Sequence, residues 1–147
     1  QRRWNNKRID VMVREIVTNE KKLREKSEKC SFPCASLKAD LEDTLLFYKD
    51  RAIGIAANMI GENKRAMAII IGGKVRVMFN PVILSASDPY FAEEGCLSLK
   101  GRRKVLRHLY IELLFSDENG REKIEGFSRL EAEAIQHEMD HMEGVII

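Results

Sequence analysis

The sequence is poor in several features, and each shortage excludes a class of protein. Three cysteines among 147 residues are too few, and odd in number, for a disulfide scaffold, and they fit a reducing cytoplasm. No apolar run approaches the roughly 20 residues of a membrane span, and the polar, charged first residues contain no signal-peptide core. The net charge is only +2, which gives no reason to expect a nucleic-acid partner. These shortages predict a cytoplasmic protein that binds neither membranes nor nucleic acids.

Hydrophobic residues make up 44% of the chain, which suffices for a core and indicates a single domain over residues 1–147. Apolar positions at helical spacing predict an amphipathic helix within residues 6–25. A second helix is expected from a Ser36 cap to about residue 50. The small, glycine-bearing residues 51–63 are typical of a strand or loop that packs closely against another segment.

The middle and end of the chain are rich in strand signals. Residues 66–71 and 75–79 flank Gly72-Gly73, which predicts a β-hairpin. Asn80-Pro81 and Asp88-Pro89 bracket what reads as a short separate strand. Strands are then expected at 104–115 and 122–127, before a helix that a capping box of Ser128 and Glu131 begins at Arg129 and Gly144 ends. The expected fold class is α+β, with antiparallel strands packed around the C-terminal helix.

The strongest chemical signal is His-Glu-Met-Asp-His at residues 137–141 of that last helix. Histidines four residues apart lie one turn apart on the same helix face, so both imidazoles reach one metal ion. Glu138 follows the first histidine and lies close enough to handle a proton of metal-bound water. This pattern predicts metal-assisted hydrolysis rather than two helix histidines beside a solvated glutamate.

A catalytic zinc-type site usually has three protein ligands and leaves a fourth position open. His108 is one candidate for the third ligand, and Cys96 is the better one, because Gly95 beside it lets the backbone approach closely. Cys30 and Cys34 are also possible metal ligands. Because no matching second pair exists, we interpret them as ordinary residues of a loop.

With these residues in view, the chain resembles the peptide deformylase family. The resemblance rests on "EEGCLS" at 93–98 together with "QHEMDH" at 136–141, and in part on "AIGIAANMIG" at 52–61. The three blocks occur in family order, and the similarity runs from about residue 37 to the C-terminus. Family members remove the N-formyl group from the initiator methionine of new bacterial proteins. Their α+β fold places antiparallel strands around a central helix that carries the two histidines.

The resemblance implies a role for each matching residue. Cys96, His137 and His141 would bind a divalent metal, typically iron(II), with zinc, nickel or cobalt as substitutes. Glu138 would be the general base for the attacking water and then the acid that protonates the leaving amine. Gln136 would support the first histidine from behind.

For the substrate, the resemblance implies an N-formylmethionyl peptide. The backbone N–H of Leu97 would polarise the formyl carbonyl, and Gly54, Leu97 and Leu130 would lie near the peptide and its methionine side chain. Each of these three also fits a plain packing role. Arg102 and Arg103 could steer a peptide backbone, although a solvated basic loop explains them equally simply.

The chain departs from the family at Met59. This position follows Ala56-Ala57 by two residues, where the family has a glutamine whose amide donates to the formyl oxygen; Ala52 also replaces the first glycine of that block. A thioether has no N–H, and loss of one oxyanion donor costs about 10²–10³ in rate in hydrolases. Asn58 carries an amide but, on a strand, would point to the opposite face.

Three functional hypotheses therefore remain open. The leading one is a peptide deformylase-type metallohydrolase, and the second is a deformylase-like paralogue that binds metal, with or without peptide, but turns over poorly or not at all. The third is a metal-binding interaction module whose charged N-terminal helix, within residues 1–25, docks a partner such as the ribosome.

Overall fold

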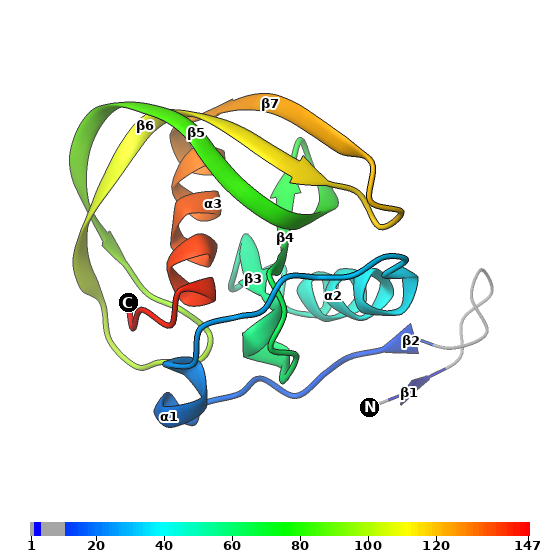
Figure 1. The fold of residues 1–147 in the computed structure, drawn as a ribbon. Coiled ribbons are helices and arrows are strands. Elements are labelled where there is room, and N and C mark those ends of the chain that lie inside the picture. Colours follow the sequence, from blue (N-terminus) through cyan, green and yellow to red (C-terminus); the bar gives the residue numbers. More distant parts are fainter. Residues whose placement is uncertain (1, 4–10) are drawn as a thin grey trace.

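A five-stranded antiparallel sheet, in the order β3-β4-β5-β6-β7, forms the frame of the molecule. The computed structural model describes residues 2–3 and 11–147. The elements are β1 (Arg2–Arg3), β2 (Val11–Met12), α1 (Glu20–Leu23), α2 (Ala35–Phe47), β3 (Gly54–Ala56), the 3₁₀ helix η1 (Ala57–Ile60), β4 (Ala66–Ile71), β5 (Lys74–Glu94), β6 (Arg103–Ser116), β7 (Glu122–Ser128) and α3 (Arg129–Met142). Figure 1 shows β5 and β6 curving around α3. The predicted α+β arrangement, with strands around the C-terminal helix, is confirmed.

Strand β4 separates two hydrophobic clusters because successive side chains of a strand point to opposite faces. Ala66 and Ala68 face the cluster built with α2, β3 and η1, whereas Met67 and Ile69 face the cluster built with α3, β6 and β7. All four side chains are fully buried. The sheet therefore holds α3 on one side and α2 on the other. None of the helices in the described part of the chain is long and apolar enough to cross a membrane.

The predicted β-hairpin is present, with Ile71 paired with Lys74 across Gly72-Gly73. The prediction of a short separate strand between the two Asx-Pro pairs is wrong, because β5 continues through both. Pro81 falls in a register irregularity between Phe79 and Val82, where a missing backbone N–H breaks no ladder bond. Asn80 and Asp88 have positive φ angles of 49° and 59°, which bend the strand without ending it.

The predicted N-terminal helix is also wrong for residues 11–19, which form β2 and an extended segment. Residues 4–10 lie outside the described part of the chain. Arg14 anchors the segment through ion pairs with Asp40 at 2.7 Å and Glu62 at 3.0 Å. The backbone N–H of Val17 donates to the carbonyl oxygen of Met59 at 2.8 Å. Tertiary contacts with α2 and η1 therefore override the helical spacing of the apolar residues.

Both long helices are present close to their predicted positions, and α2 ends at Phe47 rather than near residue 50. Helix α2 begins two residues earlier than predicted, with Cys34 as its N-cap in place of Ser36. Helix α3 begins at Arg129 with Ser128 as N-cap, as predicted, but Ser128 makes no side-chain capping hydrogen bond. Gly144, with a φ of 75°, follows the end of α3 and lets the chain turn away.

Candidate metal centre and active site

Helix α3 presents the two histidines of the metal signature on one buried face. The Nε2 atoms of His137 and His141 lie 3.1 Å apart. Two nitrogens bound tetrahedrally to one ion at zinc-type distances lie ~3.3 Å apart, so their separation suits a shared metal. Strand β5 leads into the loop that brings Cys96 to the same point, and the three ligand atoms lie within 4.8 Å of one another. This spread is close enough for one thiolate and two imidazoles to share a single ion.

Glu94 orients the first histidine. Its Oε1 lies 2.7 Å from Nδ1 of His137, which keeps the proton on Nδ1 and leaves Nε2 for a metal. Arg107 donates to both oxygens of Glu94, at 2.7 and 3.0 Å, and to Asp140 at 2.7 Å. Glu94 and Arg107 are both nearly inaccessible to solvent. This buried network fixes the ring of His137 from behind.

The electrostatics of the site favour one positive charge at the position of the histidines. Burial opposes the charge of Glu94, but hydrogen bonds from His137 and Arg107 outweigh it and lower its pKa to about 2. Burial likewise disfavours protonated His137, but hydrogen bonds with Cys96 and Glu94 raise its pKa to about 10. For His141, burial and the nearby His137 lower the pKa to about 3. A cation-friendly pocket with two nitrogen ligands and one sulfur ligand is therefore a chemically suitable metal site.

The other candidate ligands lie elsewhere. Among the described residues, the one group of three or more metal-type side chains with converging ligand atoms is Cys96, His137 and His141, so His108 is not part of it. His108 lies on β6, where its backbone bonds to Gln136. Cys30 is buried, and burial raises the pKa of its thiol to about 11.

Glu138 is the acid–base candidate, and it is buried against the same cavity. Burial raises its pKa to about 7, which suits a group that accepts and returns a proton near neutral pH. Its Oε1 has no hydrogen-bond partner among the described residues. Oε2 lies 3.1 Å from the position that a Cβ atom would occupy at Gly54. The absence of a side chain at Gly54 therefore makes room for this carboxylate.

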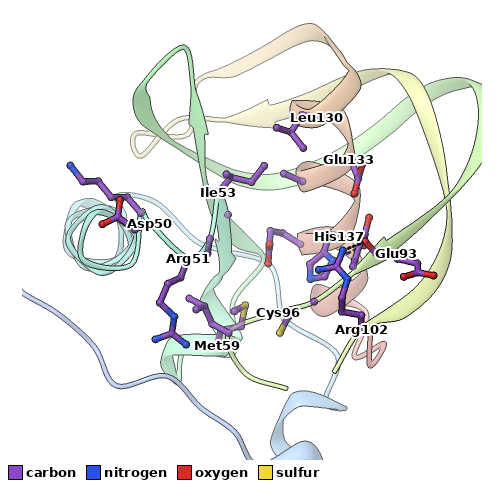
Figure 2. A pocket seen from close by; sticks show the side chains of 18 residues that line it. Asp50, Arg51, Ile53, Met59, Glu93, Cys96, Arg102, Leu130, Glu133 and His137 are labelled. Carbon is purple, nitrogen blue, oxygen red and sulfur yellow. Dashed lines mark hydrogen bonds and ion pairs between the residues drawn. The ribbon is translucent and has the colours of Figure 1, made fainter. Parts of the chain in front are cut away.

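A cavity of about 480 Å³ opens beside the three candidate ligands. Figure 2 shows Leu130, Glu133 and His137 following one another along α3, with Met59 and Cys96 at the other end. The cavity is lined by Lys49, Asp50, Arg51, Ala52, Ile53, Gly54, Met59, Glu93, Glu94, Gly95, Cys96, Leu97, Arg102, Leu130, Glu133, Ala134, His137 and Glu138. All three predicted substrate-side residues, Gly54, Leu97 and Leu130, are among them. Leu130 is 62% exposed, so it lies at the mouth rather than in the core.

Met59 lies in η1, a 3₁₀ turn, and not on a strand as the alternation argument assumed. Its sulfur accepts a hydrogen bond from the backbone N–H of Ala56 at 3.4 Å. Asn58 points away from the cavity, and its amide donates to the carbonyl oxygen of His141 at 3.0 Å. The amide of Asn58 is therefore engaged in holding α3 and does not replace the donor that a glutamine would supply.

Comparison with known proteins agrees with the metal-site geometry. The family model described as polypeptide deformylase matches residues 13–147. The chain belongs to the polypeptide deformylase family. Enzymes of this family are metal-dependent hydrolases that remove N-formyl groups.

Several individual deformylases are similar to the chain. Peptide deformylase of Clostridium beijerinckii is 43% identical over 136 residues, which is 92% of this chain and 100% of the relative. Peptide deformylase 1 of Clostridium perfringens is 40% identical, over 75% of this chain and 78% of the relative. The deformylase structure from Legionella pneumophila has a TM-score of 0.81 at 32% identity, covering 91% of this chain and 83% of its own. That from Synechococcus elongatus, in complex with actinonin, has a TM-score of 0.79 at 33% identity, covering 90% and 75%.

Sequence reasoning missed several residues around this deformylase-type site. Glu94 was visible only as part of the "EEGCLS" block, and Arg107 had no local signal at all. Gln136 was expected to support a histidine. In the structure, its amide instead bonds to both backbone groups of His108, at 2.8 Å each, and so ties α3 to β6. Glu133, on the cavity wall, was also overlooked.

Proposed function

We propose that this chain removes the N-formyl group from N-formylmethionyl peptides, using a divalent ion held by Cys96, His137 and His141. The observation that carries the proposal is the meeting of these three side chains beside a cavity that also contains the buried Glu138. Family membership supports the activity, and the ligand atoms fit a single ion. The reaction consumes water and yields formate and a free amine.

Each residue has a distinct task in this proposal. The bound ion would polarise the formyl carbonyl and lower the pKa of the attacking water. Glu138 takes the proton of that water on its unpartnered oxygen and returns it to the leaving amine nitrogen. The backbone N–H of Leu97 donates to the formyl oxygen as negative charge develops there. Glu94 keeps His137 in the tautomer that leaves Nε2 free.

We propose iron(II) as the native ion, with zinc, nickel or cobalt as functional substitutes. One thiolate and two imidazoles form a donor set that all four metals accept, so the choice among them depends on availability and coordination geometry. Metal analysis of protein purified without oxygen, followed by reconstitution with each ion, tests this assignment. Highest formate release with zinc would contradict the preference for iron.

We further propose that the protein acts in the cytoplasm on nascent chains, with transient ribosome association. This proposal follows from the substrate, because N-formylmethionine is the first residue of new bacterial proteins. Co-sedimentation of the protein with translating ribosomes tests it. A protein that never co-sediments, yet releases formate from free peptides, would retain the activity and lose this partner.

Met59 favours a second candidate, a deformylase with a slow chemical step. The cavity end that carries Met59 offers a thioether, whose sulfur already accepts a bond from Ala56, where an amide N–H would stabilise the oxyanion. Restoring that donor with Met59→Gln should raise kcat by ~10²–10³ if its loss limits the rate. An unchanged kcat would mean that other donors suffice and that the site is fully competent.

The deciding experiment measures formate release from formyl-Met-Ala-Ser by protein loaded anaerobically with iron(II) or nickel. Glu138→Gln keeps the size of the side chain but removes the base, so kcat should fall by at least ~10². Glu131→Gln is the matched control, because Glu131 lies on the same helix but outside the cavity lining. Equal activity of the Glu138→Gln variant and the wild type would refute the assigned mechanism.

A further inference from the structure

Glu133 places a carboxyl group in the wall of the cavity beside the candidate metal ligands. Ile53, Leu130 and Ala134 give the same cavity apolar lining, whereas Glu94, which also lines it, lies within hydrogen-bond reach of Glu133. Figure 2 shows Glu133 between Leu130 and His137 along α3. A carboxyl group on the wall of a pocket for a thioether side chain is unexpected, because covering it with an apolar group costs free energy.

The position of Glu133 along α3 determines which part of a bound peptide it can contact. It lies one turn before His137, and therefore ~6 Å along the helix axis from the level of the ligand. A methionine or glutamine side chain spans about the same length as this turn. A peptide whose formyl group lies at the metal ligands and whose first side chain runs along α3 toward Leu130 therefore brings the tip of that side chain to the level of Glu133.

The carboxyl group is held in place rather than swinging freely. The hydroxyl of Tyr90, on β5, donates to Oε1 of Glu133 at 3.0 Å. Burial and a hydrogen bond with Glu94 raise the pKa of Glu133, while the hydroxyl of Tyr90 lowers it. Arg107 is already bound to Glu94 and Asp140 and acts on Glu133 only as a more distant charge. Glu133 thus retains acceptor capacity that a donor on the substrate can use.

We propose that Glu133 determines specificity for the first peptide residue, by letting the cavity accept an amide-bearing side chain such as glutamine in addition to methionine. This inference rests on the proposed function, because it requires the peptide to lie with its formyl group at Cys96, His137 and His141. Glutamine has nearly the shape of methionine and adds two N–H donors. A hydrogen bond from that amide to Glu133 offsets the cost of burying it, so the cavity binds glutamine beside methionine.

The test compares two peptides, formyl-Met-Ala-Ser and formyl-Gln-Ala-Ser, by calorimetric binding to zinc-loaded protein. The measurements use a Glu138→Gln background, so that binding is read without turnover. In this background we expect Glu133→Leu to raise the ratio of methionine affinity to glutamine affinity at least ~10-fold. Glu131→Leu makes the same change outside the cavity and should leave the ratio unchanged. Glu133→Ala gives the same direction of change if the leucine variant does not fold.

The outcomes separate this inference from the proposed function. A ratio that moves less than ~3-fold in Glu133→Leu and in Glu133→Ala overturns the role of Glu133. If neither peptide binds, the proposal is also overturned, because the cavity then recognises no first side chain. If the ratio shifts as expected but the metal-loaded protein with Glu138 intact releases no formate, the specificity role holds and the proposed function fails.

Discussion

Replacing Gly54 by alanine tests how tightly Glu138, the proposed acid–base group, is held. A Cβ atom at this position would lie 2.8 Å from Cδ1 of Ile69 and 3.1 Å from Oε2 of Glu138. Ordinary contacts begin at 3.4 Å, so both neighbours have to move, Ile69 by about 0.6 Å and Glu138 by about 0.3 Å. Ile69 is fully buried in the cluster between the sheet and α3 and has little free space to move into.

Two magnitudes follow from these distances. Overpacking a filled core costs roughly 1–3 kcal/mol, so the free energy of unfolding should fall by that amount. Because a misplacement of ~1 Å can cost ~10²-fold in rate, a shift of a few tenths of an ångström in Glu138 should lower kcat by several-fold to ~10-fold. The loss should appear mainly in kcat, because the Cβ atom presses on the proton carrier rather than on the metal ligands.

The assay combines urea unfolding with steady-state formate release at saturating metal. Gly126→Ala is the matched control, because a Cβ atom there comes no closer than 3.9 Å to any neighbour and its φ is ordinary. The control should keep full activity and equal or slightly higher stability. A Gly54→Ala variant with wild-type kcat and stability would refute the reasoning, since it would show that Glu138 tolerates displacement.

Three further changes probe the surroundings of the site. Asn58→Ala removes the buried amide that donates to the backbone of His141 near the end of α3. The free energy of unfolding should fall by about 1–3 kcal/mol in denaturant titrations, and an unchanged midpoint would contradict this role. Glu94→Gln removes the charge that faces the buried guanidinium of Arg107, so we expect a loss of about 3 kcal/mol in stability and a ~10–100-fold weaker metal affinity by competition with a chelator. Cys30 is buried, and its thiol pKa is raised to about 11. Maleimide at pH 8 should therefore label the more accessible Cys34 first. Equal labelling of both cysteines in mass spectra would contradict the burial of Cys30.

The two histidines of the candidate metal centre could be predicted from sequence because their geometry is local. Two histidines four residues apart need only a helix to meet, and the helix signals before Arg129 are strong. Cys96 needed a second block to be found, because a single cysteine carries no spacing information. The predicted hairpin at Gly72-Gly73 was equally local, since the turn residues alone specify it.

The contacts that complete the site join residues far apart in the chain, so no local pattern announces them. Arg107 reaches Glu94 and Asp140 from the middle of β6, where the sequence shows only an arginine in a strand. Asn58 reaches the backbone of His141, 83 residues away. Partners of this kind are decided by how β5 and β6 curve around α3.

The two wrong elements have physical reasons as well. Residues 11–19 have helical spacing but gain more from lying extended, where Arg14 reaches Asp40 and Glu62. Prolines usually end strands, but Pro81 falls at a bulge of β5. Coverage of residues 1–147 by a single domain stays a prediction.

The hydrogen bond from Val17 to the carbonyl oxygen of Met59 gives position 59 an unusual independence. The backbone of the turn is held from outside the cavity by the N-terminal segment, and Gly61 closes the turn with a φ of 88°. Neither constraint depends on which side chain residue 59 carries. If residue 59 has the proposed role, exchange of thioether for amide would change the rate while these two backbone constraints hold the turn, and only the bond from Ala56 to the side chain would be lost.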